Sequence, residues 1–153
     1  MKNKNQIKSA LYKSCEEYIN QRIDTIEQGL ISIQESRNNE TKSSAGDKFE
    51  TGRAMMQMEE EKNIKQLSEA IIVKNELLKI KLERTIKRIE TGSLVTTDRG
   101  EYFISIGIGK VELNGQLYYC VSEQSPIGLA LKDKRVGDEI DFNGSNLKIK
   151  DIS

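Results

Sequence analysis

Apolar residues recur every three or four positions from Ile7 to Ile33, and this spacing restricts the possible folds of the chain more than any other feature. They are Ile7, Leu11, Cys15, Ile19, Ile23, Ile26, Leu30 and Ile33. A stripe with this spacing follows one face of an α-helix. Because the stripe is narrow and the other positions are polar, it is typical of a coiled-coil seam. We therefore expect a long helix that pairs with another helix.

A second, similar stripe predicts the partner helix. Its members are Met56, Ile64, Leu67, Ile71, Leu78, Leu82, Ile86 and Ile89. Residues 36–46 between the two stripes are polar and end in a glycine, so they predict a turn. Two long helices joined in this way form an antiparallel hairpin. An arm of about 35 residues would be roughly 50 Å long at about 1.5 Å per residue.

Five basic residues gather toward the end of the second stripe. They are Lys79, Lys81, Arg84, Lys87 and Arg88. If this segment is helical, the cations lie near a helix C-terminus, where the helix dipole favours positive charge. Contact with RNA or with acidic groups of a partner is the alternative explanation.

The chain changes character at Thr91–Gly92. Three of its 11 glycines precede this point, and the other eight follow it together with the single proline. Asn114–Gly115 and Asn143–Gly144 are typical of β-hairpin turns, and Ser125–Pro126 is typical of a helix start. We expect about five short antiparallel strands, at 94–97, 102–111, 117–121, 139–142 and 147–152.

These patterns together predict an α+β fold in two parts. Residues 1–91 would form the coiled-coil hairpin, with its tip near 38–50, and residues 92–153 would form a small antiparallel β domain with one short helix. In that helix, Ile127, Leu129 and Leu131 are expected to pack against the sheet.

Composition excludes several classes of function. The chain has no histidine, which removes Ser-His-Asp and Cys-His catalysis and histidine zinc sites. Its two cysteines, Cys15 and Cys120, are far apart and are expected to be a helix-seam residue and a core residue. The net charge is zero, which argues against binding nucleic acid through a bulk positive field. Because we find no membrane span and no secretory signal, we expect a cytoplasmic protein.

The run from Ser125 to Phe142 resembles the signature of the Gre-type transcript-cleavage factors. In that family a Ser-Pro-Ile/Leu helix opening precedes an alanine-leucine pair, a basic turn, Val-Gly-Asp and a strand. The matching residues here are Ser125, Pro126, Ile127, Ala130, Leu131, Lys134, Val136, Gly137 and Asp138. The resemblance implies an FKBP-like C-terminal domain that docks on RNA polymerase, and we place the docking region at Ser125, Pro126, Lys134, Gly137 and Asp138.

A second stretch, Gly46 to Glu50, is similar to the acidic tip of the Gre coiled coil. Asp47 and Glu50 keep the family spacing of acid, two residues, acid. The resemblance implies that the hairpin enters the polymerase secondary channel. There Asp47 and Glu50 would help to hold a second Mg²⁺ at the polymerase active site, and Phe49 would contact the channel.

The same resemblance implies an accessory factor that has no enzymatic activity of its own. The polymerase would hydrolyse backtracked RNA, so contact with the nascent RNA would be indirect. No cofactor would be stably bound. The sequence itself, with no apolar span and a polar break between the two helical stripes, leads us to expect no membrane contact and a free monomer.

The tip also differs from the family pattern. The family continues Glu-Asn-Ala-Glu-Tyr, whereas this chain continues Glu50-Thr51-Gly52-Arg53-Ala54. The difference favours an alternative function, that of a regulator that binds the same channel without promoting cleavage. A small isomerase and a coiled-coil dimerisation module are further alternatives.

The tip residues also have purely structural interpretations. Asp47 and Glu50 match a helix-capping box, with Asp47 as the N-cap and Glu50 three residues later. Phe49 would close the hairpin end, for instance against Ile33. Met55, Met56 and Met58 would pack in the hairpin neck, with adaptable partner contact as the alternative.

Overall fold

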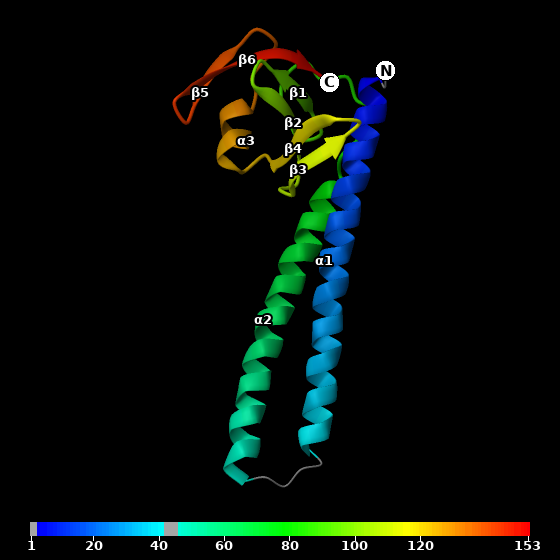
Figure 1. Cartoon of the computed structure of the whole chain (residues 1–153), viewed down its shortest axis with the longest axis vertical. Coiled ribbons are helices and arrows are strands. Elements are labelled where there is room, and N and C mark those ends of the chain that lie inside the picture. Colours follow the sequence, from blue (N-terminus) through cyan, green and yellow to red (C-terminus); the bar gives the residue numbers. More distant parts are fainter. Residues whose placement is uncertain (1–2, 42–45) are drawn as a thin grey trace. The chain divides into compact units, whose positions relative to one another are not determined.

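The computed structural model describes residues 3–41 and 46–153, without the side chains of residues 40, 41 and 46–50. Its nine elements are two long helices, then four strands, a short helix and two more strands (Figure 1). They are α1 (Lys4–Thr41), α2 (Gly46–Leu78), β1 (Leu94–Thr97), β2 (Gly100–Ser105), β3 (Gly109–Leu113), β4 (Gln116–Ser122), α3 (Pro126–Leu131), β5 (Glu139–Phe142) and β6 (Ser145–Ile152). This is the α+β class expected from the sequence.

Helix α1 begins with a reciprocal cap. The Asn3 side chain accepts a hydrogen bond from the Gln6 backbone N–H at 2.8 Å, and the Gln6 side chain accepts one from the Asn3 N–H at 3.2 Å. The predicted stripe is confirmed as the buried side of α1, because Leu11, Cys15, Ile19 and Ile33 are all buried. Leu11 and Cys15, however, belong to the unit that contains the sheet and not to the helical hairpin. The helix continues to Thr41, so the prediction that a turn starts at residue 36 was wrong.

Contacts divide the chain into two units, Ile19–Asn75 and the remainder, Met1–Tyr18 with Glu76–Ser153. The first unit consists of segments of α1 and α2 running antiparallel. The Arg37 guanidinium lies 3.0 Å from the Glu60 carboxylate, and Asn63 packs against Gly29. The pairing therefore joins later residues of α1 to earlier residues of α2.

The predicted seam of α2 matches the buried face only in part, at the partly buried Met56 and Leu67. Ile64 and Ile71 are 48% and 43% exposed, whereas Ala70 is fully buried. The buried side of α2 includes the polar Asn63 beside Gly29. A hydrophobicity pattern could not identify that side, because a polar residue occupies a position at the helix contact.

The end of α2 was also predicted wrongly. The helix stops at Leu78, where the N–H groups of Lys79 and Ile80 donate to the carbonyls of Glu76 and Leu77 at 3.2 and 3.1 Å. Leu82, Ile86 and Ile89 therefore lie outside the helix. Ile89 instead belongs to the core of the β unit, where its N–H donates to the Lys134 carbonyl at 2.8 Å.

The other unit contains a six-stranded sheet in the order β3-β4-β2-β1-β6-β5. Neighbouring strands are antiparallel except β2 and β4, which are parallel. This corrects the expected five-stranded, wholly antiparallel sheet. The run 102–111 does not form one strand, because β2 ends at Ser105 and β3 begins at Gly109. That break allows β4 to lie between β2 and β3.

Both Asn-Gly turns are confirmed. Asn114 and Gly115 have φ values of 51° and 80°, and Asn143 and Gly144 have φ values of 51° and 79°. Positive φ at both central residues is the geometry of a type I′ hairpin turn. The turns connect β3 to β4 and β5 to β6.

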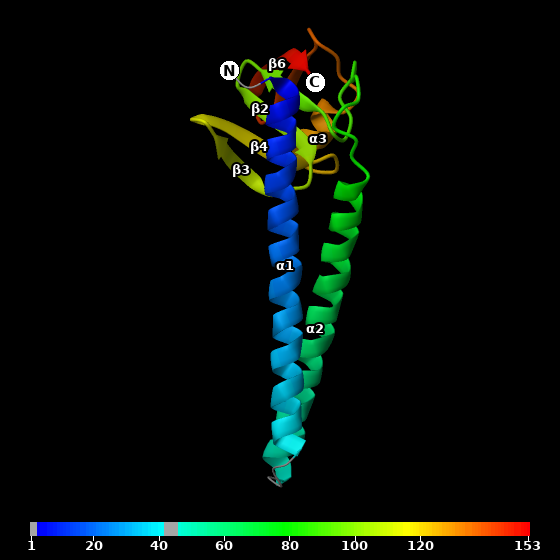
Figure 2. The same cartoon turned by 90° about the vertical axis from the view of Figure 1, so that its right-hand side faces the viewer.

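The first turns of α1 belong to the same unit as the sheet (Figure 2). Lys4 donates a hydrogen bond to the Thr96 hydroxyl at 3.2 Å, and the Cys15 thiol lies 3.4 Å from the Ser105 hydroxyl. On the sheet itself, a buried cluster gathers Val95, Ile104, Ile127, Leu131, Ile140, Leu147 and Ile149 around Ile89. Within the described residues, neither long helix has a segment apolar enough to cross a membrane.

Candidate functional site

Helix α3 is short, and its first turn is fixed by Ser125. The Ser125 hydroxyl accepts a hydrogen bond from the Gly128 N–H at 3.1 Å and donates one to the Ser122 carbonyl at 2.7 Å. Pro126 occupies the first turn, where its missing N–H costs nothing. The predicted helix start is confirmed, and Ser125 both caps α3 and ties it to the end of β4.

The turn after α3 is built largely from backbone hydrogen bonds. The Lys134 N–H donates to the Leu131 carbonyl at 3.1 Å, and the Gly137 N–H donates to the Ile149 carbonyl at 2.8 Å. The Asp138 carboxylate accepts from the Arg135 N–H at 2.8 Å. Gly137 has a φ of 94°, which favours glycine. The predicted docking residues Lys134, Gly137 and Asp138 therefore shape this turn.

Other residues of the same segment are exposed. Leu129 and Val136 are 61% and 57% exposed, and Pro126 and Arg135 are also exposed. We call these four residues the docking face. The expectation that Leu129 packs against the sheet was wrong. In a six-residue helix only one side contacts the sheet, and Ile127 and Leu131 occupy it.

A small polar network stabilises the base of α3. Glu123 accepts a hydrogen bond from the Thr91 hydroxyl, and the Lys132 ammonium lies 2.8 Å from its carboxylate. The hydrogen bonds from Lys132 and then Thr91 lower the pKa of Glu123. The network connects the end of β4, the segment before β1 and the residue after α3.

The predicted tip residues lie at the start of the second long helix. Asp47, Phe49 and Glu50 belong to the first turns of α2, but their side chains lie outside the described residues. The contact between Phe49 and Ile33 therefore stays a prediction. Met55 and Met58, farther along α2, are 66% and 70% exposed. The expectation that they pack in the hairpin neck was wrong.

The described residues contain no cluster of three or more acidic or cysteine ligands that could hold a metal ion. Cys15 and Cys120 are free and buried. A hydrogen bond with Cys15, together with burial, raises the pKa of the Cys120 thiol, so it is a poor nucleophile. Asp47 and Glu50, three residues apart on a helix, remain the candidate pair for a shared cation.

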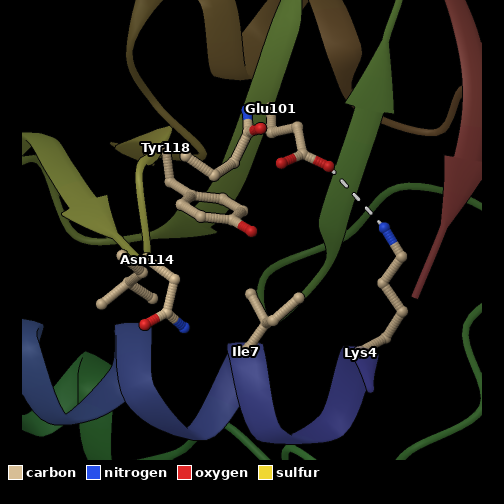
Figure 3. Close-up of a pocket in the computed structure, with 7 residues that line it drawn as sticks. Lys4, Ile7, Glu101, Asn114 and Tyr118 are labelled. Atoms are coloured by element: carbon tan, nitrogen blue, oxygen red, sulfur yellow. Dashed lines mark ion pairs between the residues drawn. The ribbon is translucent and has the colours of Figure 1, made fainter. Parts of the chain in front are cut away.

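A cavity of about 580 Å³ between the start of α1 and the sheet was not predicted (Figure 3). Its lining includes Lys4 and Ile7 from α1, and Glu101, Tyr118 and Asn114 from the sheet and its β3–β4 turn. The Lys4 ammonium lies 3.7 Å from the Glu101 carboxylate. Burial and the nearby Glu101 charge raise the pKa of Tyr118. The pairing of β2 with β4 places Glu101 beside Tyr118, and the start of α1 adds Lys4 and Ile7.

No protein-family model matches the chain, and no curated protein matches it. Among solved structures, the chain is similar to the GreA factor homolog 1 (Gfh1) protein of Thermus thermophilus, with 19% identity over 90% of this chain and 94% of that chain and a TM-score of 0.37. A structure described as the transcription factor Gfh1 is 18% identical over 90% of this chain and 92% of that chain, with a TM-score of 0.35.

Proposed function

We propose that this protein is a Gre-type transcription factor that binds RNA polymerase, inserts its helical hairpin into the secondary channel and promotes cleavage of backtracked RNA. The observation that carries the proposal is the 125–142 segment. The family-like run forms a capped helix, a tight turn and a strand, and it leaves Leu129 and Val136 exposed.

The docking face is suited to a protein partner. Its apolar members Leu129 and Val136 are of a kind that protein interfaces bury at their centre, with polar residues around them. Arg135 and the nearby exposed Asp133 and Asp138 carry charges of both signs, so the partner surface would combine apolar groups with charges of both signs. Ser125, Lys134, Gly137 and Asp138 would act indirectly, by holding the segment in shape.

The two helices supply an arm of the length that the proposal requires. Helix α1 has 38 residues and α2 has 33. At about 1.5 Å per residue, they are roughly 57 Å and roughly 50 Å long, and the hairpin unit itself contains residues 19–41 of α1 and 46–75 of α2. A helical arm of this length can carry residues at its tip into a narrow channel.

Asp47 and Glu50 would contribute oxygen ligands to Mg²⁺ at the polymerase active site. Helix α2 contains both positions, and residues three apart are neighbours along a helix. Two carboxylates alone bind Mg²⁺ weakly, because the ion keeps most of its water ligands. The polymerase would therefore have to supply the other ligands, and the chemistry would take place only in the complex.

The test is RNA shortening in a stalled, backtracked polymerase complex. The protein should accelerate Mg²⁺-dependent shortening, and Asp47→Asn with Glu50→Gln should abolish the acceleration while polymerase binding persists. A matched control is Glu59→Gln with Glu61→Gln, which removes two exposed acids from the same helix. Normal acceleration by the Asp47/Glu50 variant would contradict the proposed tip mechanism.

A second candidate is a regulator that occupies the channel without promoting cleavage. The Thr51-Gly52-Arg53 sequence favours it, because asparagine, glutamate and tyrosine of the family tip have no counterpart here. Polymerase binding with intact RNA and inhibited transcription would identify this function. The same stalled complex distinguishes the two candidates in one experiment.

A further inference from the structure

The segment after α2 concentrates positive charge. Residues 79–88 hold Lys79, Lys81, Arg84, Lys87 and Arg88 but one acid, Glu83, in a chain whose net charge is zero. All five cations are exposed, with Lys79 and Arg84 side chains 72% and 64% accessible. Clustering on this scale needs an explanation.

The dipole of α2 does not explain the whole cluster of basic residues. Helix α2 ends at Leu78 and has no basic residue in its last turn. Lys79 directly follows the helix, but the other four cations lie on non-helical backbone beyond it, where the interaction with its dipole falls off.

Three of these cations surround a pocket of about 460 Å³. Lys79, Lys81 and Arg84 line it together with the aliphatic side chains of Ile80 and Ile86. Glu76 and Thr91 complete the lining. The volume is within the range of pockets that hold small ligands, about 300–1,000 Å³.

The pocket keeps an excess of positive charge after its ion pairs are counted. Lys79 lies 3.0 Å from Glu76, and Arg84 lies 3.3 Å from Glu90. Lys81 has no ion pair among the described residues, and neither does nearby Lys87. Glu123 reaches the rim through its bond with Thr91, but Lys132 neutralises it.

We propose that this pocket binds a short chain of phosphate groups, such as the triphosphate of a nucleotide or of an RNA 5′ end. Lys81 would supply an unpaired ammonium, and Arg84 would supply the planar guanidinium that binds phosphate oxygens in pairs. The proposal does not depend on polymerase binding, because every residue it uses belongs to this chain.

The existing ion pairs would not prevent binding. Exposed ion pairs such as Lys79–Glu76 contribute little to stability, so exchange of the carboxylate for a phosphate costs little. A ligand with several charges can contact Lys79, Lys81 and Arg84 together. A single phosphate should therefore bind more weakly than tripolyphosphate.

The test is isothermal titration calorimetry of the full chain with inorganic tripolyphosphate at low salt without Mg²⁺. We expect saturable binding that weakens as salt rises. Lys81→Gln with Arg84→Gln should weaken it about tenfold or more, since each charged hydrogen bond lost is costly. The matched control, Lys110→Gln with Lys150→Gln, removes two exposed lysines from β3 and β6.

The outcomes are distinguishable. Retained binding in the control and weakened binding in the pocket variant would support the site. Absence of binding in the unmodified chain, or equal loss in both variants, would overturn it. Separate titrations with ATP and with an RNA that carries a 5′ triphosphate distinguish a nucleotide from an RNA 5′ end as the source of the phosphate chain. An RNA with a 5′ hydroxyl that binds as well as the triphosphate RNA would overturn an oligophosphate site.

Discussion

A Cβ atom placed on Gly128 would collide with the carbonyl oxygen of Ser122. The backbone of α3 is thus in direct contact with the end of β4, at a distance that no side chain permits. The same packing buries Ile127 and Leu131 and leaves Leu129 exposed. The position of the docking face depends on this contact.

Gly128→Ala should therefore destabilise the β unit. The added methyl group would displace α3 from β4, because the atoms it meets are backbone atoms that cannot rotate away. We expect the free energy of unfolding to fall by about 1–3 kcal/mol or more, measured by urea denaturation. Gly107→Ala is the control, since a Cβ there meets nothing within 4 Å. Equal stability of the two variants would contradict the contact.

Lys8→Met should stabilise the protein. Lys8 is 1% exposed and makes no hydrogen bond or close ion pair with the described residues. Burial lowers its pKa, and the Glu90 charge only partly opposes the effect. Methionine keeps the length and helix preference without the cost of a buried charge. We expect a gain of about 1 kcal/mol in thermal or urea unfolding, whereas Lys13→Met, at an exposed position of α1, should change little.

The pH dependence gives a separate test of Lys8. Between the lowered folded-state pKa and the ordinary value of 10.5, the unfolded chain binds more protons than the folded chain. The contribution of Lys8 to the free energy of unfolding therefore rises with pH between these two pKa values. The stability difference between Lys8→Met and the unmodified protein should shrink as pH approaches 10.5. A constant difference would show that Lys8 does not titrate abnormally.

Glu123 should contribute stability that is lost in acid. Because Lys132 and Thr91 lower its pKa, its contribution is complete above the ordinary value of 4.5 and disappears as pH falls through the folded-state pKa. Glu123→Gln should thus weaken the acid dependence of unfolding and lower stability at neutral pH. Unfolding curves from pH 7 down to about pH 2 test this, and an unchanged acid dependence would argue against the network.

Ser125→Ala should remove the cap of α3. The hydroxyl bonds to both Gly128 and Ser122 would be lost, and we expect a cost of about 1 kcal/mol. Ser125→Thr retains a hydroxyl and should recover most of the stability in the same measurement. A threonine variant as unstable as the alanine variant would show that the hydroxyl bonds are not the source.

Features encoded by a few adjacent residues were predictable from the sequence. Asn114–Gly115 and Asn143–Gly144 specify their turns because both residues of each pair adopt positive φ. Ser125–Pro126 specifies a helix start for an equally local reason. The α1 seam was also predictable, since its apolar spacing is uninterrupted.

Features that depend on distant residues were not predictable. Ile86 and Ile89 continue the helical spacing of α2, yet both are buried outside the helix, and Ile89 joins the core of the β unit. The parallel pairing of β2 with β4 joins strands separated by β3. The local sequence pattern predicts neither the end of α2 nor the pairing of β2 with β4. The burial of Lys8 was not predictable either, because a lysine on a polar helix ordinarily faces solvent.

The most direct test of the central claim is the affinity of the purified protein for its own RNA polymerase, measured by fluorescence anisotropy with a labelled chain. The account predicts saturable binding that Leu129→Ser with Val136→Ser weakens strongly, while unfolding stability stays nearly unchanged because both residues are exposed. Leu117→Ser, at an exposed leucine of β4, should bind normally. Absence of polymerase binding, or full affinity in the Leu129/Val136 variant, would contradict the account.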